Sequence, residues 1–405
     1  MTQRRVALRV RDGLVVALVL GLAASISLSE VSIVALAASL VWIRPLRSWR
    51  AWPLLAPLAA FAVWSVIVAL VSAAPWESLS ATRSLLPLAT FWVVVGALDD
   101  PAAAHRFAVR LLWALAAVAL LSIVQVATCT ADRYDATPPG WPPVVGAFIG
   151  KCRRAHGFFS IYMTLAGVLT TTLAAMLPRV VAGGARVATL GVAWLINALA
   201  LALTLVRGAW LGLAAGMVVT LSALGRRAFV VIAVVAIGIA VLAIPSVRER
   251  AGTMVHGGDA TAGERLAMLH AGLRLVREHP VAGIGPGQVK HAYPIYAPPE
   301  ALRRHTSHLH NTPLQIAVER GLVGLALWLW IFVEFFVKTR HILRRVPASA
   351  TADRALVIGA LAAVTAFLVA GLFEYNFGDT EVLLVTLAVM ALPFVIERDL
   401  AERRA

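Results

Sequence analysis

Long apolar runs separated by short polar segments follow one another along almost the whole chain. The clear runs cover residues 54–73, 107–128, 158–177, 187–205, 208–225, 228–245, 321–337 and 355–373, and shorter ones cover 13–28, 31–43, 85–98 and 382–396. About 20 apolar residues in a helix cross the roughly 30 Å of hydrocarbon in a bilayer. A helix also satisfies the backbone polar groups of such a run inside lipid. We therefore predict an all-α polytopic membrane protein with about twelve transmembrane helices.

The composition supports the same class of protein. Of the 405 residues, 60% are hydrophobic and 14% are charged, and the mean hydropathy is +0.83. A soluble domain carries about 25% charged residues. The basic start "MTQRR" before an apolar run is also typical of a cleaved signal peptide. With so many runs behind it, a retained first helix is the better interpretation.

Basic residues in the short loops predict the orientation of the spans. They gather in 44–50, 178–186, 225–227, 338–345 and the tail "ERRA". Successive spans place all of these segments on the same side of the membrane. The segment 99–106 falls on that side too but is not clearly basic. Because Lys and Arg favour the cytoplasmic side, both termini are predicted there. This gives a transmembrane region over 1–245 with about nine helices and a small outer loop at 129–157. A large outer loop follows at 246–312, and a C-terminal region of about three helices at 313–405.

The large outer loop holds most of the unusual polar residues. It carries eight Lys and Arg against five Asp and Glu, and seven of the ten histidines of the chain. Topology accounts for much of the net charge of +15, but not for an excess of cations outside. A basic outer surface favours phosphate-bearing lipid ligands. Nucleic acid is a poor candidate, because the basic residues are spread over both sides of the membrane.

One segment of this loop, "TAGERLAMLHAGLRLVREHP", reads as an amphipathic helix. Thr261 and Glu264 have the spacing of a capping box. An apolar stripe is formed by Leu266, Leu269, Leu273 and Val276, with His270, Arg274 and Arg277 on the other side. Arg265 in the first turn opposes the helix dipole. Arg265 can form an ion pair with Glu264 or Asp259, or it can strengthen a phosphate site at the helix start. We favour the phosphate site.

The segments after this helix predict tight turns and a surface for a sugar or lipid. The first outer loop predicts a disulfide. The stretch "VAGIGPGQ" lacks the strand and helix of a nucleotide-binding loop, so its glycines indicate tight turns. The next stretch, "YPIYAPPEALRRHTSHLHN", places Arg303 and Arg304 among tyrosines and prolines that suit a sugar or a lipid interface. Cys129 and Cys152 both fall in the first outer loop, where a disulfide is predicted, with two free thiols as the alternative.

Two histidines and an asparagine, His308, His310 and Asn311, stand directly before an apolar run. Three interpretations are possible. These residues lie at a water–lipid boundary, they bind a metal together with His305, or they belong to a catalytic site. The sequence has neither an HExxH motif nor a cysteine cluster to support a metal site, so we expect neither a metal nor another cofactor. A neutral imidazole is suited to take a proton from a hydroxyl, which favours a general base.

Arg207, in "LTLVRGAWLG", lies between two apolar runs with almost no other loop. A guanidinium at this depth is costly unless it faces water or an anion, although it can also extend to the interface. On the predicted topology it shares the outer side with His310. An imidazole base and guanidinium groups without an obvious metal fit glycosyl transfer from a lipid pyrophosphate, since arginine stabilises the charge on the departing pyrophosphate.

Two motifs in these segments resemble the O-antigen ligase family, within the larger O-antigen ligase and polymerase superfamily. One is an arginine, three residues and a leucine, matched by "RGAWL". The other is His, then Asn, Ser or Gln, nine residues, Gly, two residues, and Gly, Thr or Tyr. The stretch "HNTPLQIAVERGLVG" matches it with His310, Asn311, Gly321 and Gly324. The resemblance is best over residues 200–325, and the N-terminal half matches in hydropathy alone.

The resemblance implies an inverting, metal-independent glycosyltransferase of the bacterial inner membrane with its active site facing the periplasm. It would move O-antigen polysaccharide from undecaprenyl pyrophosphate to lipid A–core during lipopolysaccharide biosynthesis. His310 would activate the acceptor hydroxyl, with His308 as the reserve candidate, and Arg207 and Arg265 would hold pyrophosphate. Further substrate contacts are expected from Asn311, Arg153, Arg154, His156, Arg303 and Arg304.

Three other functions stay open at this point. An O-antigen polymerase shares the donor chemistry but tends to show two sizeable Arg-rich outer loops, whereas the first outer loop here is modest. A protein O-oligosaccharyltransferase shares the histidine motif. A transporter or flippase predicts internal repeats and ionisable residues in mid-membrane. The polar residues of this sequence instead gather at one membrane edge, so the transporter ranks low.

Overall fold

The computed structural model describes residues 2–43, 52–129, 152–182, 187–225, 260–299 and 301–402, and all regular structure in these ranges is helical. The helices of the first half are α1 (Thr2–Ala24), α2 (Ile26–Ile43), α3 (Leu55–Val71), α4 (Pro75–Ala81), the 3-10 helix η2 (Thr82–Ala89), α5 (Thr90–Ala97), α6 (Pro101–Ala127) and α9 (Tyr162–Val181). Those of the second half are α10 (Val187–Leu203), α11 (Arg207–Ala223), α14 (Ala260–Glu278), α15 (Val289–Tyr296), α16 (Thr312–Arg345), α17 (Thr351–Ala370) and α18 (Thr380–Glu402). The prediction of an all-helical chain is confirmed for this part of the protein.

Six helical segments of the described chain are long and apolar enough to cross a membrane. They are Pro75–Ala97, which joins α4, η2 and α5, together with α6, α9, α16, α17 and α18. Shorter apolar helices lie within α2, α3, α10 and α11. The predicted run 228–245 falls outside the described residues, as do Asp259 and most of the loop 129–157. The count of twelve spans and the outer position of the long loop therefore stay predictions.

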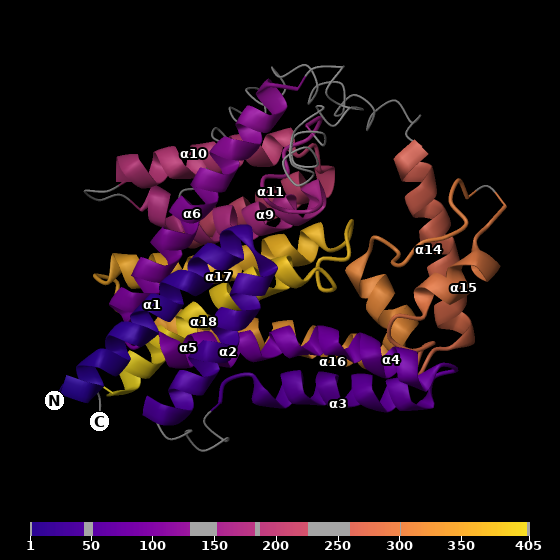
Figure 1. Cartoon of the computed structure of the whole chain (residues 1–405), viewed down its shortest axis with the longest axis horizontal. Helices are drawn as coiled ribbons and strands as arrows, with labels where there is room; N and C mark the ends of the chain where they lie inside the picture. Colours follow the sequence, from indigo (N-terminus) through magenta and orange to yellow (C-terminus); the bar gives the residue numbers. More distant parts are fainter. Residues whose placement is uncertain are drawn as a thin grey trace, which may run out of the picture.

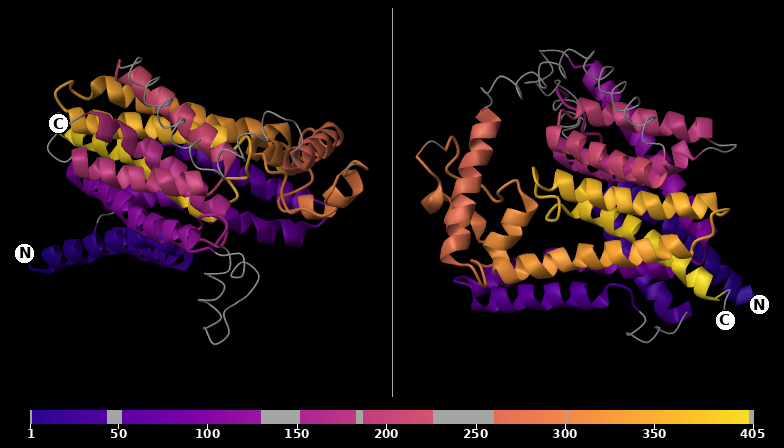
Figure 2. Two further views of the ribbon diagram at one scale, coloured as in Figure 1. Left: turned by 90° about the horizontal axis from the view of Figure 1, so that it is seen from above. Right: turned by 180° about the vertical axis from the view of Figure 1, so that it is seen from behind.

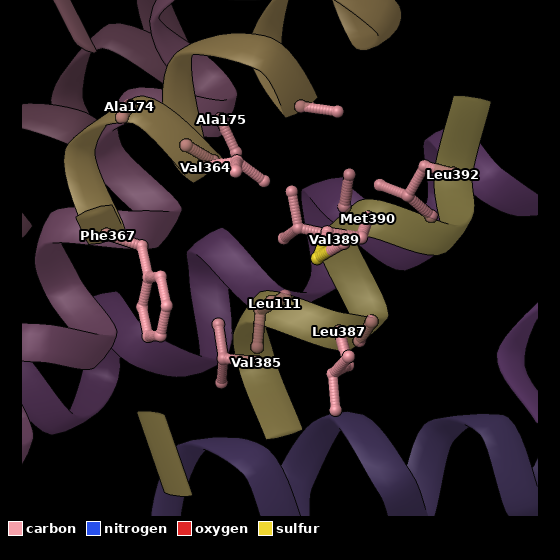
Figure 3. Packing of buried hydrophobic residues seen from close by; sticks show 14 of the residues in the cluster. Leu111, Ala174, Ala175, Val364, Phe367, Val385, Leu387, Val389, Met390 and Leu392 are labelled. Carbon is pink, nitrogen blue, oxygen red and sulfur yellow. The ribbon is translucent and has the colours of Figure 1, made fainter. Parts of the chain in front are cut away.

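The centre of the bundle is formed by α9, α17 and α18, whose side chains are buried along most of their length. Figure 3 shows part of this packing, in which Leu111 of α6 and Phe367 of α17 lie among residues of α9 and α18. Small residues allow the closest approach: a side chain at Gly359 would overlap the carbonyl oxygen of Ala175. Such contacts between backbones are typical of membrane helices, since lipid gives little hydrophobic drive for their association.

The two ends of the bundle are different. Helices α14 and α15 cover one end, with α14 running across the ends of the long helices, while α1 begins and α18 ends at the opposite end (Figures 1 and 2). A second apolar cluster joins α14 and α15 to the start of α16, through residues that include Met268, Tyr293 and Leu314. The segment that carries the unusual polar residues is therefore a packed cap on one end of the bundle.

The apolar stripe predicted on α14 is not the face through which the helix packs against the protein. Leu266, Leu269 and Leu273 are 53%, 38% and 42% exposed. The helix instead packs through a neighbouring face whose buried residues are Glu264, Ala267, Met268, Ala271, Gly272 and Leu275. Small residues at 271 and 272 let this second face approach its neighbours closely, and a side chain at Gly272 would overlap that of Leu314. Periodicity alone does not distinguish between two adjoining apolar faces.

The predicted capping box is also wrong. Helix α14 is described from Ala260, so Thr261 lies inside the helix and not before it. The carboxylate of Glu264 accepts hydrogen bonds from the backbone N–H groups of Leu302 (2.9 Å) and Arg303 (3.2 Å). Glu264 therefore holds a following loop against α14 and does not close the helix start.

One buried ion pair departs from the expectation that polar groups gather at a single edge. Arg11 of α1 is 1% exposed and pairs with Asp99, which lies between α5 and α6 at the end away from α14. Near it, the guanidinium of Arg398 donates to the carbonyl oxygens of Val95 (2.8 Å) and Asp99 (2.9 Å). The end of the bundle away from α14 is thus also fastened by charged groups.

Candidate active site

A cavity of about 390 Å³ lies between α14 and the ends of the neighbouring helices. Its polar lining consists of Arg154, Tyr162, Arg207, Glu264, Arg265, Arg303, His310 and Glu374. These residues come from five separate parts of the chain. The two predicted key residues, His310 and Arg207, therefore lie in one chamber, although 103 positions separate them in the sequence. The volume is within the range of about 300–1,000 Å³ that is usual for ligand pockets.

His310 lies directly before α16, in a loop that is held from two sides. Its φ of 49° is in the left-handed region, which is uncommon for a residue with a side chain. Asn311 caps α16, because its side-chain oxygen accepts from the backbone N–H of Leu314 (2.9 Å). The amide nitrogen of the same side chain donates to the carbonyl of Leu372 (2.9 Å). Asn311 thus uses both polar atoms within the protein and fixes the backbone beside His310.

The segment between α17 and α18 is fastened to the same helix start. The backbone N–H of Thr312 donates to the carbonyl of Gly371 (2.7 Å), and its hydroxyl donates to the carbonyl of Glu374 (2.8 Å). These bonds bring Glu374 next to His310. The carboxylate is 10% exposed.

Glu374 connects the imidazole to a guanidinium. Its Oε2 lies 2.8 Å from Nδ1 of His310, and its Oε1 is paired with the guanidinium of Arg265. Arg265 therefore pairs with Glu374 and not with Glu264, while Asp259, the other partner considered from the sequence, lies outside the described residues. The sequence interpretation missed Glu374. The available signal was a polar stretch, "EYNFGD", between two apolar runs on the predicted outer side.

The position of Glu374 determines the tautomer of His310. An ionised carboxylate has only acceptors to offer, so Nδ1 of the imidazole carries the proton and donates it to Oε2. In a neutral ring, Nε2 then keeps its lone pair. His310 lines the cavity, so its ring can offer an acceptor nitrogen to a ligand there.

His308 has different surroundings. Its ring contacts that of His310 with 4.3 Å between centroids, and that of Tyr375 at 6.0 Å. Its Nδ1 is buried without a hydrogen-bond partner. Burial, followed by the nearby charge of His310, lowers the pKa of His308 to about 4, against the opposing effect of Glu374. His308 is not among the cavity-lining residues, so it contacts the ring of His310 from behind and does not reach the chamber.

Arg207 is the first residue of α11 and lines the cavity. The chain turns sharply before it, since Leu205 has a φ of 58°. Gly208 follows, and a side chain there would overlap Phe373 in the segment between α17 and α18. This close contact brings the start of α11, with Arg207, against the segment that carries Glu374.

Arg154 reaches the cavity from the first predicted outer loop. Its guanidinium lies 4.3 Å from the ring centroid of Tyr162, and both residues line the chamber. A disulfide between Cys129 and Cys152, with 5.3 Å between the Cα atoms, joins this segment to the end of α6. Arg153 and His156 do not line the cavity. His156 is 5% exposed, and its Nδ1 lies 3.1 Å from the carbonyl oxygen of Phe159.

Arg303 lines the cavity from the loop after α15, and its backbone is held by Glu264 as described above. Arg304 does not line it. The guanidinium of Arg304 donates instead to the carbonyl oxygens of Ala297 and Pro299, each at 3.3 Å. Of the two adjacent arginines, the structure therefore brings Arg303 to the chamber and leaves Arg304 to brace the loop.

A buried polar network lies beneath the histidine loop. The backbone N–H of Leu309 donates to the side chain of Gln315 (2.9 Å), whose amide donates to Glu319 (2.8 Å). Glu319 also accepts from Arg320 (2.7 Å) and from the backbone of Gly287 (3.0 Å). Both charged side chains are almost fully buried. The network ties the histidine loop and the glycine-rich segment to α16.

The motif glycine Gly321 interrupts α16 with a φ of 68°. A side chain there would overlap the backbone of Val281. Because the helix is broken, the carbonyls of Val318 and Glu319 are free to accept from the backbone of Ile284 (2.9 Å) and Gly285 (3.0 Å). The predicted turn glycines 283, 285 and 287 all have positive φ. The second motif therefore encodes both the position of His310 and the docking of the glycine-rich segment.

The cavity is electropositive. Its lining holds four guanidinium groups and two carboxylates, besides His310. Within the described ranges, His, Cys, Asp and Glu side chains form no group of three that could hold a metal ion. The arrangement suits a ligand with more than one negative charge, together with a hydroxyl near His310.

Residues 190–329 match the family model described as O-antigen ligase. This part of the chain is therefore similar to the O-antigen ligase family. This confirms the resemblance seen in the sequence and supports a glycosyltransferase-like enzyme of the O-antigen ligase and polymerase type, acting on lipid-linked glycans. A search of curated proteins finds no match. The matched segment includes Arg207, Arg265, Arg303 and His310, whereas Arg154 and Glu374 lie outside it.

Proposed function

We propose that the protein transfers O-antigen polysaccharide from undecaprenyl pyrophosphate to a sugar hydroxyl of lipid A–core. In this reaction the acceptor oxygen attacks the anomeric carbon of the donor, and the bond from that carbon to the pyrophosphate oxygen breaks. The hydroxyl proton passes to the enzyme, and undecaprenyl pyrophosphate leaves. A single displacement from the opposite face inverts the anomeric configuration.

In this proposal His310 is the general base. Its Nε2 takes the proton of the acceptor hydroxyl while Nδ1 keeps its hydrogen bond to Glu374. The imidazolium that forms lies beside a carboxylate, which stabilises the positive charge as it develops. His308 is a poorer candidate, because its pKa of about 4 makes it a weak base and it does not line the cavity.

The guanidinium groups are proposed to hold the pyrophosphate. Arg207 and Arg265 line the cavity beside His310, and Arg154 and Arg303 complete its cationic lining. Arginine offers two parallel donors to a phosphate, and the charge on the leaving group increases as the bond breaks. Stabilising that charge lowers the barrier without a metal ion.

The observation that carries the proposal is the shared cavity of His310, Glu374, Arg265 and Arg207. We further propose that this cavity faces the periplasm across the inner membrane and that residues 246–312 form the outer cap between two transmembrane regions. The last turn of α16 supports this orientation, since it ends in Arg344 and Arg345 at the far end from His310.

The test is transfer by purified protein supplied with lipid-linked O-antigen and lipid A–core, with a chelator in place of divalent metal. The expected product is lipid A–core bearing the polysaccharide, formed far more slowly by His310→Ala protein of equal folded amount. Lengthening of the lipid-linked glycan without transfer to lipid A–core would indicate a polymerase instead. Transfer to a pilin-like protein alone would indicate a protein O-oligosaccharyltransferase.

A further inference from the structure

A second pocket, of about 200 Å³, lies at the end of the bundle away from His310. It is formed between α1, the end of α5 and the first turns of α6. Its charged lining residues are Asp12 of α1 and Arg106 and Arg110 of α6. The catalytic proposal uses none of them.

The three charged side chains are exposed and have no ion pair or hydrogen bond within the part of the chain that the structure describes. Arg110 lies in the third turn of α6, which is one of the candidate spans. A guanidinium at that depth is costly unless an anion or water reaches it. The nearby pair of Arg11 and Asp99 is closed on itself, so it leaves the pocket groups for a ligand.

Both helices become apolar on the same faces further along. On α1, Asp12 is followed at four-residue steps by Val16 (36% exposed) and Leu20 (52% exposed). On α6, Arg110 is followed three residues later by Trp113, which is 43% exposed. The surface therefore has a charged head region and an apolar continuation, which is the pattern of a phospholipid.

We propose that this pocket binds a phospholipid whose headgroup carries a primary ammonium next to its phosphate, as phosphatidylethanolamine does. Arg106 and Arg110, one turn apart on α6, hold the phosphate. Asp12 accepts hydrogen bonds from the ammonium group. Gly13 leaves room for the headgroup, since a side chain there would meet no atom within 4 Å. The acyl chains lie along Val16, Leu20 and Trp113.

Native mass spectrometry of the purified full-length protein tests this proposal. The protein is delipidated and titrated with phosphatidylethanolamine, phosphatidylcholine and phosphatidylglycerol of the same acyl chains. We expect phosphatidylethanolamine to bind about tenfold more tightly than phosphatidylcholine, whose quaternary ammonium has no N–H to donate to Asp12. Equal affinities for these two lipids, or a preference for phosphatidylglycerol, would overturn the proposal.

Variants test the contacts with the ammonium group and with the phosphate separately. Asp12→Asn should lower the affinity for phosphatidylethanolamine to that for phosphatidylcholine. The double variant Arg106→Gln, Arg110→Gln should lose both lipids, while Arg340→Gln, an exposed arginine of α16 outside the pocket, should bind as the parent does. Unchanged lipid binding by the double variant would refute the site.

A soluble ligand is the alternative source of the same chemistry. O-phosphoethanolamine, which lacks the acyl chains, should fail to bind at the concentrations where the lipid saturates the protein. If it binds as tightly as the lipid, the pocket belongs to a soluble phosphate ester and the lipid proposal is wrong. Circular dichroism and gel filtration of each variant show whether a loss of binding reflects loss of fold.

Discussion

Two carboxylate–guanidinium pairs at the α14 end of the molecule have the same chemistry and different surroundings. In one, Glu374 and Arg265 are 10% and 28% exposed and line the 390 Å³ cavity together with His310. In the other, Glu319 and Arg320 are 4% and 3% exposed, and neither lines that cavity. The first pair faces a space that a ligand can enter, and the second does not.

The bonding of the two pairs explains what each can do. Glu319 accepts from Gln315, Gly287 and Arg320, while Arg320 also donates to Ser65 of α3 (2.9 Å). That pair is satisfied within the protein and holds two segments together. Glu374 instead orients His310, whose ring faces the cavity. An ion pair is thus a functional candidate when it borders an accessible space, and a structural one when its hydrogen bonds are closed.

The largest expected effect belongs to the imidazole of the open pair. His310→Ala should lower the rate of transfer by about 10³-fold, since a general base contributes about 10²–10⁴-fold. The measurement is single-turnover transfer with donor and acceptor at saturation. His270→Ala, which removes an exposed imidazole from α14, is the matched control and should be as active as the parent. Equal activity of the two variants would remove His310 from the role of base.

The next effect is expected at Arg207. Arg207→Lys keeps the charge but loses the two-pronged contact with phosphate, so kcat should fall by about 10- to 100-fold. Arg277→Lys on the exposed side of α14 serves as the control for the same exchange. If lysine at 207 supports full turnover, a point charge is sufficient and the proposed bidentate contact is wrong.

Glu374→Gln tests whether the carboxylate orients and stabilises the imidazole. The amide retains the size of the side chain but loses the charge next to the imidazolium. A hydrogen bond to a charged group contributes about 1.5–3 kcal/mol, which corresponds to a fall in kcat of about 10- to 100-fold. KM should change less than kcat, because Glu374 acts through His310. A rise in KM at constant kcat would assign Glu374 to substrate binding instead.

The closed pair should behave in the opposite way. Glu319→Gln leaves the buried guanidinium of Arg320 without its counter-ion, which costs about 3–5 kcal/mol of stability. The thermal midpoint in detergent should therefore fall clearly, while the turnover of the protein that remains folded changes by less than it does in Glu374→Gln. Glu334→Gln, from a half-exposed pair with Lys338 on the same helix, should lower the midpoint only slightly. A large loss of turnover without loss of stability in Glu319→Gln would break the distinction between the two pairs.

The sequence predicts the helices of the bundle, and it places His310 and Arg207 in the chamber that they both line, for a clear reason. Apolar runs specify helices in a membrane almost independently of their partners, so α1–α3, α5, α6, α9–α11 and α16–α18 overlap the predicted runs. The two motifs are local in sequence. His310 and Arg207 could be assigned to one chamber because each stands at the end of an apolar run on the same predicted side.

The contacts of the site were less accessible to sequence reasoning. Glu374 reaches His310 only because Asn311 and Thr312 bind the backbone of residues 371–374, and no periodicity reports such tertiary bonds. The face of α14 was misjudged because Ala271 and Gly272 pack more closely than the larger Leu269 and Leu273 on the neighbouring face. Hydropathy ranks leucine above glycine, whereas close packing of helices favours small residues.

The smallest effect on turnover is expected at His308, and it concerns pH. Burial lowers the pKa of His308 in the folded protein to about 4, from an ordinary value near 6.5. Between these values the unfolded chain binds a proton that the folded protein does not, so stability falls as the pH decreases from about 6.5 to about 4. Above pH 6.5 this contribution is fully present. The charged groups that face the ring are His310 and Glu374, and they are retained in the test.

The measurement compares the thermal midpoint of parent and His308→Gln protein between pH 4 and 7.5. The variant should lose part of the acid-dependent decrease, because the titrating ring is gone, while its turnover at pH 7.5 stays within a few-fold of the parent. His270→Gln, on the exposed side of α14, should follow the curve of the parent. An unchanged pH curve in His308→Gln would mean that His308 is protonated in the folded protein as easily as in the unfolded chain. His308 would then compete with His310 as a base, and the contrast between a ring that faces the chamber and a ring behind it would have to be given up.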